Sequence, residues 1–516
     1  MHERKCANFL VGLLLVTATF VAVGSAHAQS GAQVTIHWNR VIRVSNTSAS
    51  LQIATEPPLL RTSAIHNRLF EDLRGLGADY MRYILYFPQP KLVVAELDPP
   101  GNGKTSWDFS LIDPIMEDFM RAAAGHPVVV NFSTIPEWMF KTPKPVPYPS
   151  DPNQVDQDYS QGTQLRDPSM KEVADYYRRV VSWYTRGGFS DEYGKWHASG
   201  HDYKINYWEF LNEIEYEHQM TPQVYTALYD AVVSAIREVA PRMKFVGLAL
   251  ADTSPYQAFV HEDPPYFQYF LNPKNHRPGI PLDMISYHFY AVPATDEPPE
   301  VWQFTFFDQA DGFLEAVNYI ESIRQKLSPR TRTDVDEIGT ILPNPKILPR
   351  GVIPDLYWNL RGAMYAYVYA GLARLGIDIA AGSQFTEYPI EFPDFSLVDM
   401  KTGQPNANFW VIQLLRDNFG PGDKLVDTRL NLDSVSAQGW ITHSGERKVL
   451  LINKRNKFIT ITIPGKGGGV EEFVDETTGY NPPGHSHLAE NSVMLRPFAV
   501  AAVTLDGLER TGRQRH

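Results

Sequence analysis

Residues 205–218, INYWEFLNEIEYEH, begin as a buried strand and end among four glutamates. The first half is rich in aromatic and β-branched residues, which favour a strand. Helical patterns with apolar residues at three- and four-residue spacing lie on both sides, at 170–187 and 221–240. A strand between two helices is the repeating unit of a parallel α/β sheet.

The same unit recurs along most of the chain. Strand–helix alternation repeated eight times predicts an α/β fold, a (β/α)8 TIM barrel over residues 48–418. An open doubly wound sheet is the alternative, but no glycine-rich phosphate loop follows the first strand. The eight predicted strands are SLQIAT (50–55), ADYMRYILYF (78–87), PVVVNFS (127–133), KINYWEF (204–210), KFVGLAL (244–250), DMISYHF (283–289), RTDVDEI (332–338) and IDIAAGSQF (377–385).

The sequence changes character after residue 418. Residues 419–508 hold short β-rich runs separated by Gly, Asn and Pro, which predicts a C-terminal β-sandwich domain. Residues 29–47 form an extended segment before the barrel that could add a strand to this sandwich. Residues 509–516 are predicted to be a solvated tail.

The amino terminus has the pattern of a secretory signal peptide. Arg4 and Lys5 precede an apolar stretch, and small residues at Ala26 and Ala28 offer a cleavage site, so we predict a signal over residues 1–28. An uncleaved membrane anchor is the alternative reading. Cys6, the only cysteine, lies within this segment, so the predicted mature chain has no disulfides. The expected location is secreted or periplasmic.

The composition narrows the possible partners. A net charge of −12 argues against general binding to nucleic acid or to anionic membranes. The 26 Tyr and ten Trp suit a surface that stacks on sugar rings. No cofactor or metal is predicted, because the His485-x-His487 pair has no further clustered ligands. The oligomeric state stays open.

Two glutamates close predicted strands that meet at one face of the barrel. Asn212 and Glu213 end the fourth strand, and Glu337 ends the seventh. The carboxyl ends of barrel strands converge, so these carboxylates are expected to face each other across a pocket. Cleavage of a glycosidic bond requires such a pair: one acid to protonate the leaving oxygen, and one carboxylate to attack or to activate water.

This arrangement resembles the clan A retaining glycoside hydrolases, the 4/7 superfamily of barrels. YWEFLNE (207–213) resembles the acid/base motif of that clan. DMISYHFY (283–290) resembles the strand-six segment of glycoside hydrolase family 39, the β-xylosidases and α-L-iduronidases, where a β-sandwich also accompanies the barrel. The resemblance covers most of the chain but rests on three or four short motifs.

The resemblance implies a role for each strand-end residue. Glu213 would be the general acid/base, Glu337 the nucleophile, and Asn212 the partner of the sugar 2-hydroxyl. Asp334 and Asp336 are competing acids on the same strand, and strict alternation places them on the face opposite to Glu337. Alternation would also separate Asn212 from Glu213, unless a bulge or a sharp turn ends the strand.

The remaining glutamates of the opening stretch receive different predictions. Glu209 lies four positions before Glu213 and therefore deeper in the barrel, with Arg82 as its candidate partner. The clan resemblance gives Arg82 an alternative role, contact with the nucleophile. Glu215 and Glu217 are predicted to face solvent or the rim of the site.

Three further residues are candidates for binding the sugar. His288 and Tyr290 close the sixth strand, where the family places a contact to the nucleophile or the sugar; a structural role is the alternative for each. Trp138 follows the third strand and could form a stacking floor for the sugar, or pack within its loop.

One departure from the clan pattern affects the innermost sugar site. The clan commonly has a tryptophan at the end of strand eight, where this sequence has Gln384 and Phe385. Glu387 lies close to the same strand end and is the best rival for a carboxylate role.

The predicted function is a secreted retaining glycoside hydrolase that uses two glutamates on an oligosaccharide or polysaccharide. The alternatives are a catalytically silent carbohydrate-binding barrel and a transglycosylase with the same residues. A β-xyloside, a β-glucoside, an α-L-arabinoside and a uronic-acid sugar are all compatible with the sequence.

Overall fold

The computed structural model describes residues 32–86, 89–156, 159, 162–251, 253, 265–343, 353–387, 394–464, 468–488 and 490–506. The predicted signal at 1–28, with Cys6, and the predicted tail at 509–516 lie outside the described residues. Among the helices that are described, none has the length and apolar character needed to cross a membrane.

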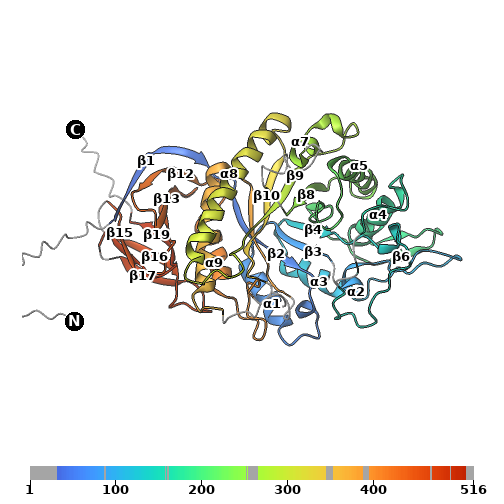
Figure 1. Cartoon of the computed structure of the whole chain (residues 1–516), viewed down its shortest axis with the longest axis horizontal. Coiled ribbons are helices and arrows are strands. Elements are labelled where there is room, and N and C mark those ends of the chain that lie inside the picture. Colours follow the sequence, from blue (N-terminus) through green and yellow to red (C-terminus); the bar gives the residue numbers. More distant parts are fainter. Residues whose placement is uncertain are drawn as a thin grey trace, which may run out of the picture. The chain divides into compact units, whose positions relative to one another are not determined.

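Eight parallel strands close into a barrel, which confirms the predicted fold class (Figure 1). Each predicted run overlaps one of these strands, and the two ends of the series, β2 and β11, pair to close the ring. In order around the ring they are β2 (Ser48–Ala54), β3 (Met81–Leu85), β4 (Val128–Phe132), β7 (Tyr207–Glu209), β8 (Lys244–Leu250), β9 (Met284–Ala291), β10 (Arg332–Thr340) and β11 (Ile379–Gly382).

Helices follow the barrel strands along the chain. Amphipathic α1 (His66–Leu76) is capped by Gly77, which adopts a left-handed φ of 53° that suits glycine. The longer helices are α1 (His66–Leu76), α3 (Ile112–Ala122), α4 (Lys171–Arg186), α5 (Pro222–Val239), α8 (Trp302–Leu327), α9 (Tyr357–Leu375) and α10 (Ala407–Asn418), and the short ones are α2 (Pro90–Val93), α7 (Tyr266–Phe270), η1 (Pro57–Leu59), η2 (Glu137–Met139) and η3 (Pro273–Asn275). A hairpin of β5 (Gly188–Ser190) and β6 (Trp196–Ala198), which the sequence did not predict, follows α4.

The barrel interior changes from apolar to polar along its strands. Near the amino-terminal ends, a separate apolar cluster contains Val129, Tyr207, Val246, Met284, Ile379 and Ala381. Two residues further along three of these strands, on the same face, stand Asn131, Glu209 and Ser286, all fully buried. The polar layer therefore lies toward the carboxyl ends, where barrel enzymes place their sites.

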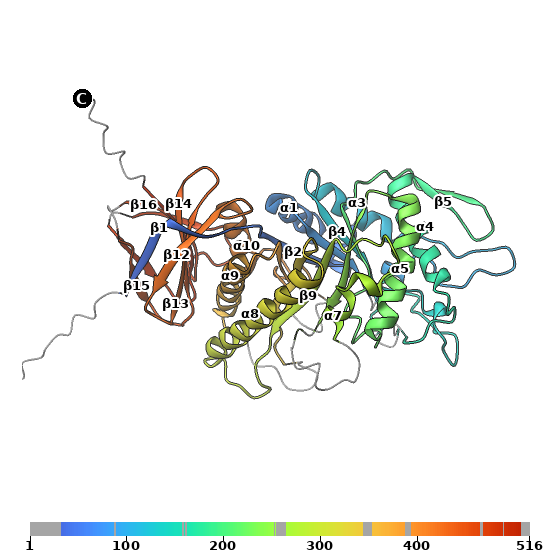
Figure 2. The same cartoon turned by 90° about the horizontal axis from the view of Figure 1, so that it is seen from above.

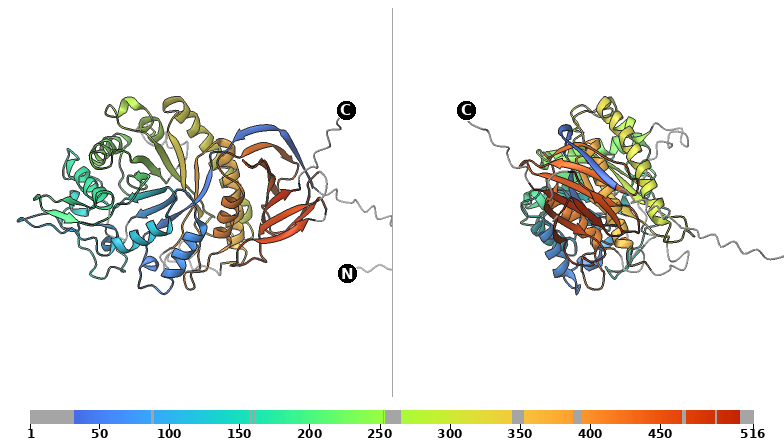
Figure 3. Two further views of the ribbon diagram at one scale, coloured as in Figure 1. Left: turned by 180° about the vertical axis from the view of Figure 1, so that it is seen from behind. Right: turned by 90° about the vertical axis from the view of Figure 1, so that its left-hand side faces the viewer.

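The other nine strands form one hydrogen-bonded series with its own apolar core, which agrees with the predicted sandwich. Strand β1 belongs to this series although it precedes the barrel, and it lies beside β12 with Val34 opposite Leu430 (Figure 3). The series runs β17 (Gly484–Leu488), β16 (Gly469–Val474), β19 (Val500–Leu505), β14 (Arg447–Asn453), β13 (Val435–Ile441), β12 (Lys424–Leu430), β1 (Ala32–Val44), β15 (Ile459–Thr462), β18 (Ser492–Leu495).

Helices α9 and α10 contact both the barrel and the sandwich strands (Figure 2). The Arg374 guanidinium of α9 donates to Gln438 Oε1 on β13 at 2.7 Å. Asn418, the last residue of α10, accepts from Lys448 Nζ on β14 at 2.7 Å. The sandwich is therefore joined to the barrel by polar contacts as well as by packing.

Candidate active site

A sharp turn brings Asn212 and Glu213 to the same end of the barrel. Strand β7 stops at Glu209, and the residues Leu211 and Glu213 have positive φ values of 62° and 39°. The Glu213 amide then donates to the carbonyl of Ala249, near the end of β8, at 2.8 Å. This is the sharp turn that the sequence analysis required if Asn212 and Glu213 were not to point to opposite faces.

A register shift in β10 brings two adjacent acids into the barrel interior. The pairing of β10 with β9 slips between Val335 and Glu337. Asp336 and Glu337 consequently both approach the Arg82 guanidinium, Asp336 Oδ2 at 3.1 Å from Nε and Glu337 Oε1 at 2.7 Å from Nη1. The expectation that Asp336 faces away from Glu337 was wrong, because a bulge interrupts the period of two.

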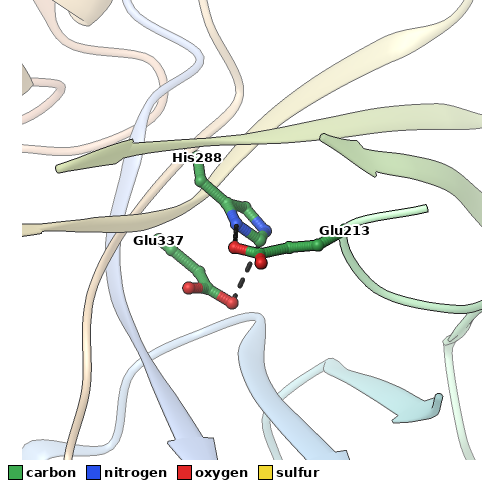
Figure 4. Close-up of side chains that lie close together, drawn as sticks. All are labelled: Glu213, His288 and Glu337. Atoms are coloured by element: carbon green, nitrogen blue, oxygen red, sulfur yellow. Dashed lines mark hydrogen bonds and ion pairs between the residues drawn. The ribbon is translucent and has the colours of Figure 1, made fainter. Parts of the chain in front are cut away.

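The carboxylates of Glu213 and Glu337 face each other beside His288 (Figure 4). One oxygen of each carboxylate and one ring nitrogen of His288 all lie within 4.8 Å of one another. The Glu213 side chain is 29% exposed, whereas that of Glu337 is 7% exposed. Two carboxylates thus share one pocket, one reaching toward solvent and the other enclosed.

Glu337 is held by donors on both oxygens. Oε1 accepts from Arg82 at 2.7 Å, and Oε2 accepts from the Tyr290 hydroxyl at 2.5 Å. Burial and the neighbouring Glu337 raise the pKa of Tyr290 well above its ordinary value, so the phenol keeps the proton that it donates. Gly339 makes room for this tyrosine, because a Cβ there would lie 2.9 Å from the Tyr290 ring.

Arg82 connects the interior acids with the pocket. Its fully buried guanidinium donates to Glu209 at 2.5 Å, to Glu337 at 2.7 Å and to Asn212 Oδ1 at 2.7 Å. Both roles considered for this residue are therefore present, partner of the interior glutamate and contact of the strand-seven glutamate. Because protein groups surround it, Arg82 orients these side chains from the barrel interior and does not line the pocket itself.

Glu209 occupies the interior position predicted for it. Ser286 and Asn131 also donate to its carboxylate, at 2.6 and 2.8 Å. Burial raises the pKa of Glu209 to about 7, against the opposing charge of Arg82. This carboxyl group belongs to the support of the site.

His288 is a buried cation among acids. Its Nδ1 lies 3.1 Å from Glu213 Oε1, and its Nε2 lies 3.4 Å from Glu337 Oε1 and 3.6 Å from Asp336 Oδ1. Burial disfavours the charged ring, but the charges of Glu337 and Asp336 outweigh it and raise the pKa of His288 well above its ordinary value.

The same trio, Glu213, His288 and Glu337, has the ligand types and the spacing of a metal site. A protonated imidazole has no lone pair for a metal ion, so the raised pKa of His288 favours an ion-pair network. The expectation that the protein needs no metal remains a prediction.

Glu217 is half-buried beside Asn212, which fits the second of the two positions predicted for it, the rim of the site. Its backbone amide donates to the Glu213 carbonyl at 2.8 Å, so one turn of chain returns the side chain toward the pocket. There Glu217 Oε1 accepts from Asn212 Nδ2 at 2.9 Å. Sequence reasoning missed this contact, although the i, i+4 spacing from Glu213 is a usable signal.

Trp138 makes the loop contacts that the sequence offered as the alternative to a stacking floor, and a role in sugar binding stays a prediction. The indole N–H donates to the carbonyl of Glu96 at 2.8 Å, and the Arg166 guanidinium lies 4.4 Å from the ring centroid. Neighbouring charged groups in the same groove include Asp167, Lys171 and Glu172. An aromatic ring covered by a cation in this way is typical of loop packing.

Tyr86 is a site residue that the sequence analysis did not select. It follows β3, and burial together with the charges of Glu387, Glu56 and Glu217 raises its pKa well above the ordinary value. Glu387, the rival carboxylate, is itself buried and accepts from Gln384. The signal for Tyr86 was its position directly after a barrel strand.

Comparison with known proteins gives matches among solved structures only. Neither the protein-family models nor the curated proteins contain a match. A conserved exported protein from Bacteroides fragilis is 12% identical with a TM-score of 0.62, over 92% of this chain and 100% of that one. A GH51 arabinofuranosidase from Xanthomonas axonopodis pv. citri is 10% identical with a TM-score of 0.60, over the same shares of the two chains.

A GH30 endoxylanase from Clostridium papyrosolvens C71 is also similar, with 13% identity and a TM-score of 0.56 over 92% of this chain and 100% of that one. At these identities the likeness concerns the fold. Barrel and sandwich together are shared, since the matches extend over nearly the whole chain.

Proposed function

We propose that this protein is a retaining glycoside hydrolase of clan A in which Glu213 is the general acid/base and Glu337 the nucleophile. The observation that carries the proposal is the pair of carboxylates from the turn after β7 and from β10, with one oxygen of each within 4.8 Å of the other. Retaining enzymes hold their carboxyl groups about 5 to 5.5 Å apart, and inverting enzymes about 6.5 to 9.5 Å. Oxygens this close together support the retaining arrangement over the inverting one.

The surroundings of the two glutamates support different roles. Both oxygens of Glu337 accept hydrogen bonds, as an acceptor-only ionised carboxylate does, and its enclosure keeps water from competing for the sugar carbon. Glu213 is the more exposed of the two and can exchange protons with solvent between the two steps. Glu337 would attack the anomeric carbon while Glu213 protonates the leaving oxygen, and Glu213 would then deprotonate the incoming water.

Asn212 is the proposed partner of the sugar 2-hydroxyl. Its Oδ1 accepts from Arg82 and one N–H is donated to Glu217, which leaves one N–H for a substrate. Tyr290 and His288, which contact Glu337 and Glu213, would keep the two carboxylates in place during the reaction.

The substrate is proposed to be an oligosaccharide or polysaccharide outside the cytoplasm. The fold neighbours include an arabinofuranosidase and an endoxylanase, and one neighbour is described as an exported protein. Within the clan, the segment DMISYHFY favours family 39, whereas these neighbours carry the designations GH51 and GH30. The first assay should therefore include aryl β-xylosides, β-glucosides and α-L-arabinofuranosides, with Glu337→Gln as the blank.

Chemical rescue separates the roles of the two glutamates. Glu337→Ala should abolish turnover of every substrate, because no covalent intermediate can form. Glu213→Ala should still be glycosylated by an aryl glycoside with a good leaving group, and azide should accelerate release of the sugar as a β-glycosyl azide from a β-glycoside. Azide can enter because the shortened side chain leaves space and no longer repels an anion.

Three outcomes would contradict the proposal. Rescue of Glu337→Ala with inverted product, and none of Glu213→Ala, would exchange the two roles. Sugar binding without cleavage across a broad panel would favour a silent carbohydrate-binding barrel. Transfer to added alcohols or sugars in place of hydrolysis, read by NMR of the products, would identify a transglycosylase.

A further inference from the structure

Glu217 completes a clamp on the side chain proposed to bind the sugar. Asn212 is only 4% exposed, and its amide is bonded at both ends: Oδ1 accepts from Arg82 at 2.7 Å, and Nδ2 donates to Glu217 Oε1 at 2.9 Å. These two bonds fix the rotation of the amide plane. They leave a single N–H, whose direction depends on both partners.

Glu217 lies where a negative charge is unfavourable. Its Oε2 is shielded from solvent and has no hydrogen-bond partner among the described residues. Burial raises the pKa of Glu217 well above its ordinary value, and the charges of Glu213 and Glu337 act in the same direction against the smaller effect of His288.

No further cation approaches Glu217 in the described part of the site. Tyr86 and Tyr177, whose own pKa values are raised mainly by burial and also by the charge of Glu217, are the other titratable groups near it. Burial and the neighbouring acids therefore both favour the neutral form of this carboxyl group.

We propose that Glu217 is a positioning residue for the proposed reaction and acts as a neutral carboxylic acid. It aims the free N–H of Asn212 at the sugar 2-hydroxyl, and by staying uncharged it places no additional negative charge one turn from Glu213. That second effect matters because Glu213 must release a proton in the first step, and a nearby anion opposes the release. The role rests on the proposed glycosidase function.

Two substitutions of Glu217 distinguish the effect of its hydrogen bond to Asn212 from the effect of a negative charge. Glu217→Gln has the size of the neutral acid and keeps an oxygen for Asn212, so kcat/KM should stay within about threefold of wild type. Glu217→Ala frees the amide of Asn212, and kcat should fall about tenfold with a smaller change in KM, since the lost contact tightens in the transition state. Glu238→Gln removes a charge from the exposed side of α5 and serves as the control.

Substrate chemistry and pH give readouts that a purely structural role would not change. On the matching 2-deoxy glycoside, Glu217→Ala and wild type should be equal, because Asn212 then has no hydroxyl to hold. The basic limb of the kcat/KM profile, which reports the acid/base proton, should not move in Glu217→Gln. A shift of that limb by about one unit to lower pH would mean that Glu217 carried a charge in the wild type, and the proposal would fail.

A titration keeps the inference testable if no substrate is found. In protein labelled with 13C at glutamate carboxyls, one signal that is absent from Glu217→Gln should still be protonated at pH 7. If this signal titrates near pH 4.5, or if Gln is as damaging as Ala, the inference is wrong. Failure of wild type to cleave any glycoside would instead reject the proposed function, while the titration would still decide the charge of Glu217.

Discussion

Replacing Arg82 by Met should cost the barrel several kcal/mol, and the cost should grow with pH. The guanidinium is fully buried and lies within 3.1 Å of three carboxylates, those of Glu209, Asp336 and Glu337. Removing one partner of a buried ion pair costs about 3 to 5 kcal/mol, because the other charge stays behind. At pH 5 the acids can take up protons, as the pKa of about 7 for Glu209 indicates, so we expect about 3 kcal/mol there.

At pH 8 a buried acid without Arg82 either stays charged or takes up a proton from a solution that holds few. Both cost free energy, so the loss should approach about 5 kcal/mol. The sign follows from proton binding: without Arg82 the folded state binds more protons than the unfolded state, so stability falls as pH rises. Urea unfolding of wild type and Arg82→Met at both pH values, followed by tryptophan fluorescence, measures the difference.

The control for this experiment is Arg68→Met, which breaks the pair with Asp72 one helical turn away on α1. Arg68 is 45% exposed, and a pair of this kind contributes about 0.3 to 0.5 kcal/mol. A loss below about 1 kcal/mol for Arg82→Met, or an equal loss at pH 5 and pH 8, would refute the reasoning about buried charge.

Two further substitutions test groups around the site. Tyr290→Phe removes a donor from Glu337 and should lower kcat about tenfold, with KM nearly constant, whereas Tyr193→Phe on the surface should change neither. Burial lowers the pKa of His218 to about 3, so its contribution to stability is present above pH 6.5 and is lost as the pH falls toward 3. His218→Phe should reduce the acid sensitivity of the unfolding free energy by up to about 1.4 kcal/mol per pH unit between pH 6 and 4.

The fold could be predicted well from the sequence because the apolar patterns of strands and of helices each recur over most of the chain. Eight strand runs separated by amphipathic helices can close in few ways, and every run overlaps a barrel strand. The pairing of Glu213 with Glu337 also followed from topology, since the carboxyl ends of barrel strands meet.

Local breaks in these periods were predicted only at Asn212 and Glu213, where alternation demanded a turn. The register shift in β10 turned Asp336 inward beside Glu337, and nothing in DVDEIGT marks the position of a bulge. The turn after Glu213 returned Glu217 to the pocket, although polar residues beyond a strand usually face water. The partner of Trp138 lies 28 residues away in the chain at Arg166, where no periodic pattern connects them.

Strand β1 has a consequence for how the chain is made. It is the first described strand, yet its neighbours β12 and β15 are synthesised only after the entire barrel. Until then β1 carries unpaired backbone groups on both edges, and its residues Val41, Ile42 and Val44 remain about half exposed even in the finished fold. Such an edge is a template for association between chains. The period of greatest vulnerability to aggregation is therefore the time between emergence of β1 and completion of β12, when an unpaired β1 can meet the same strand of another copy.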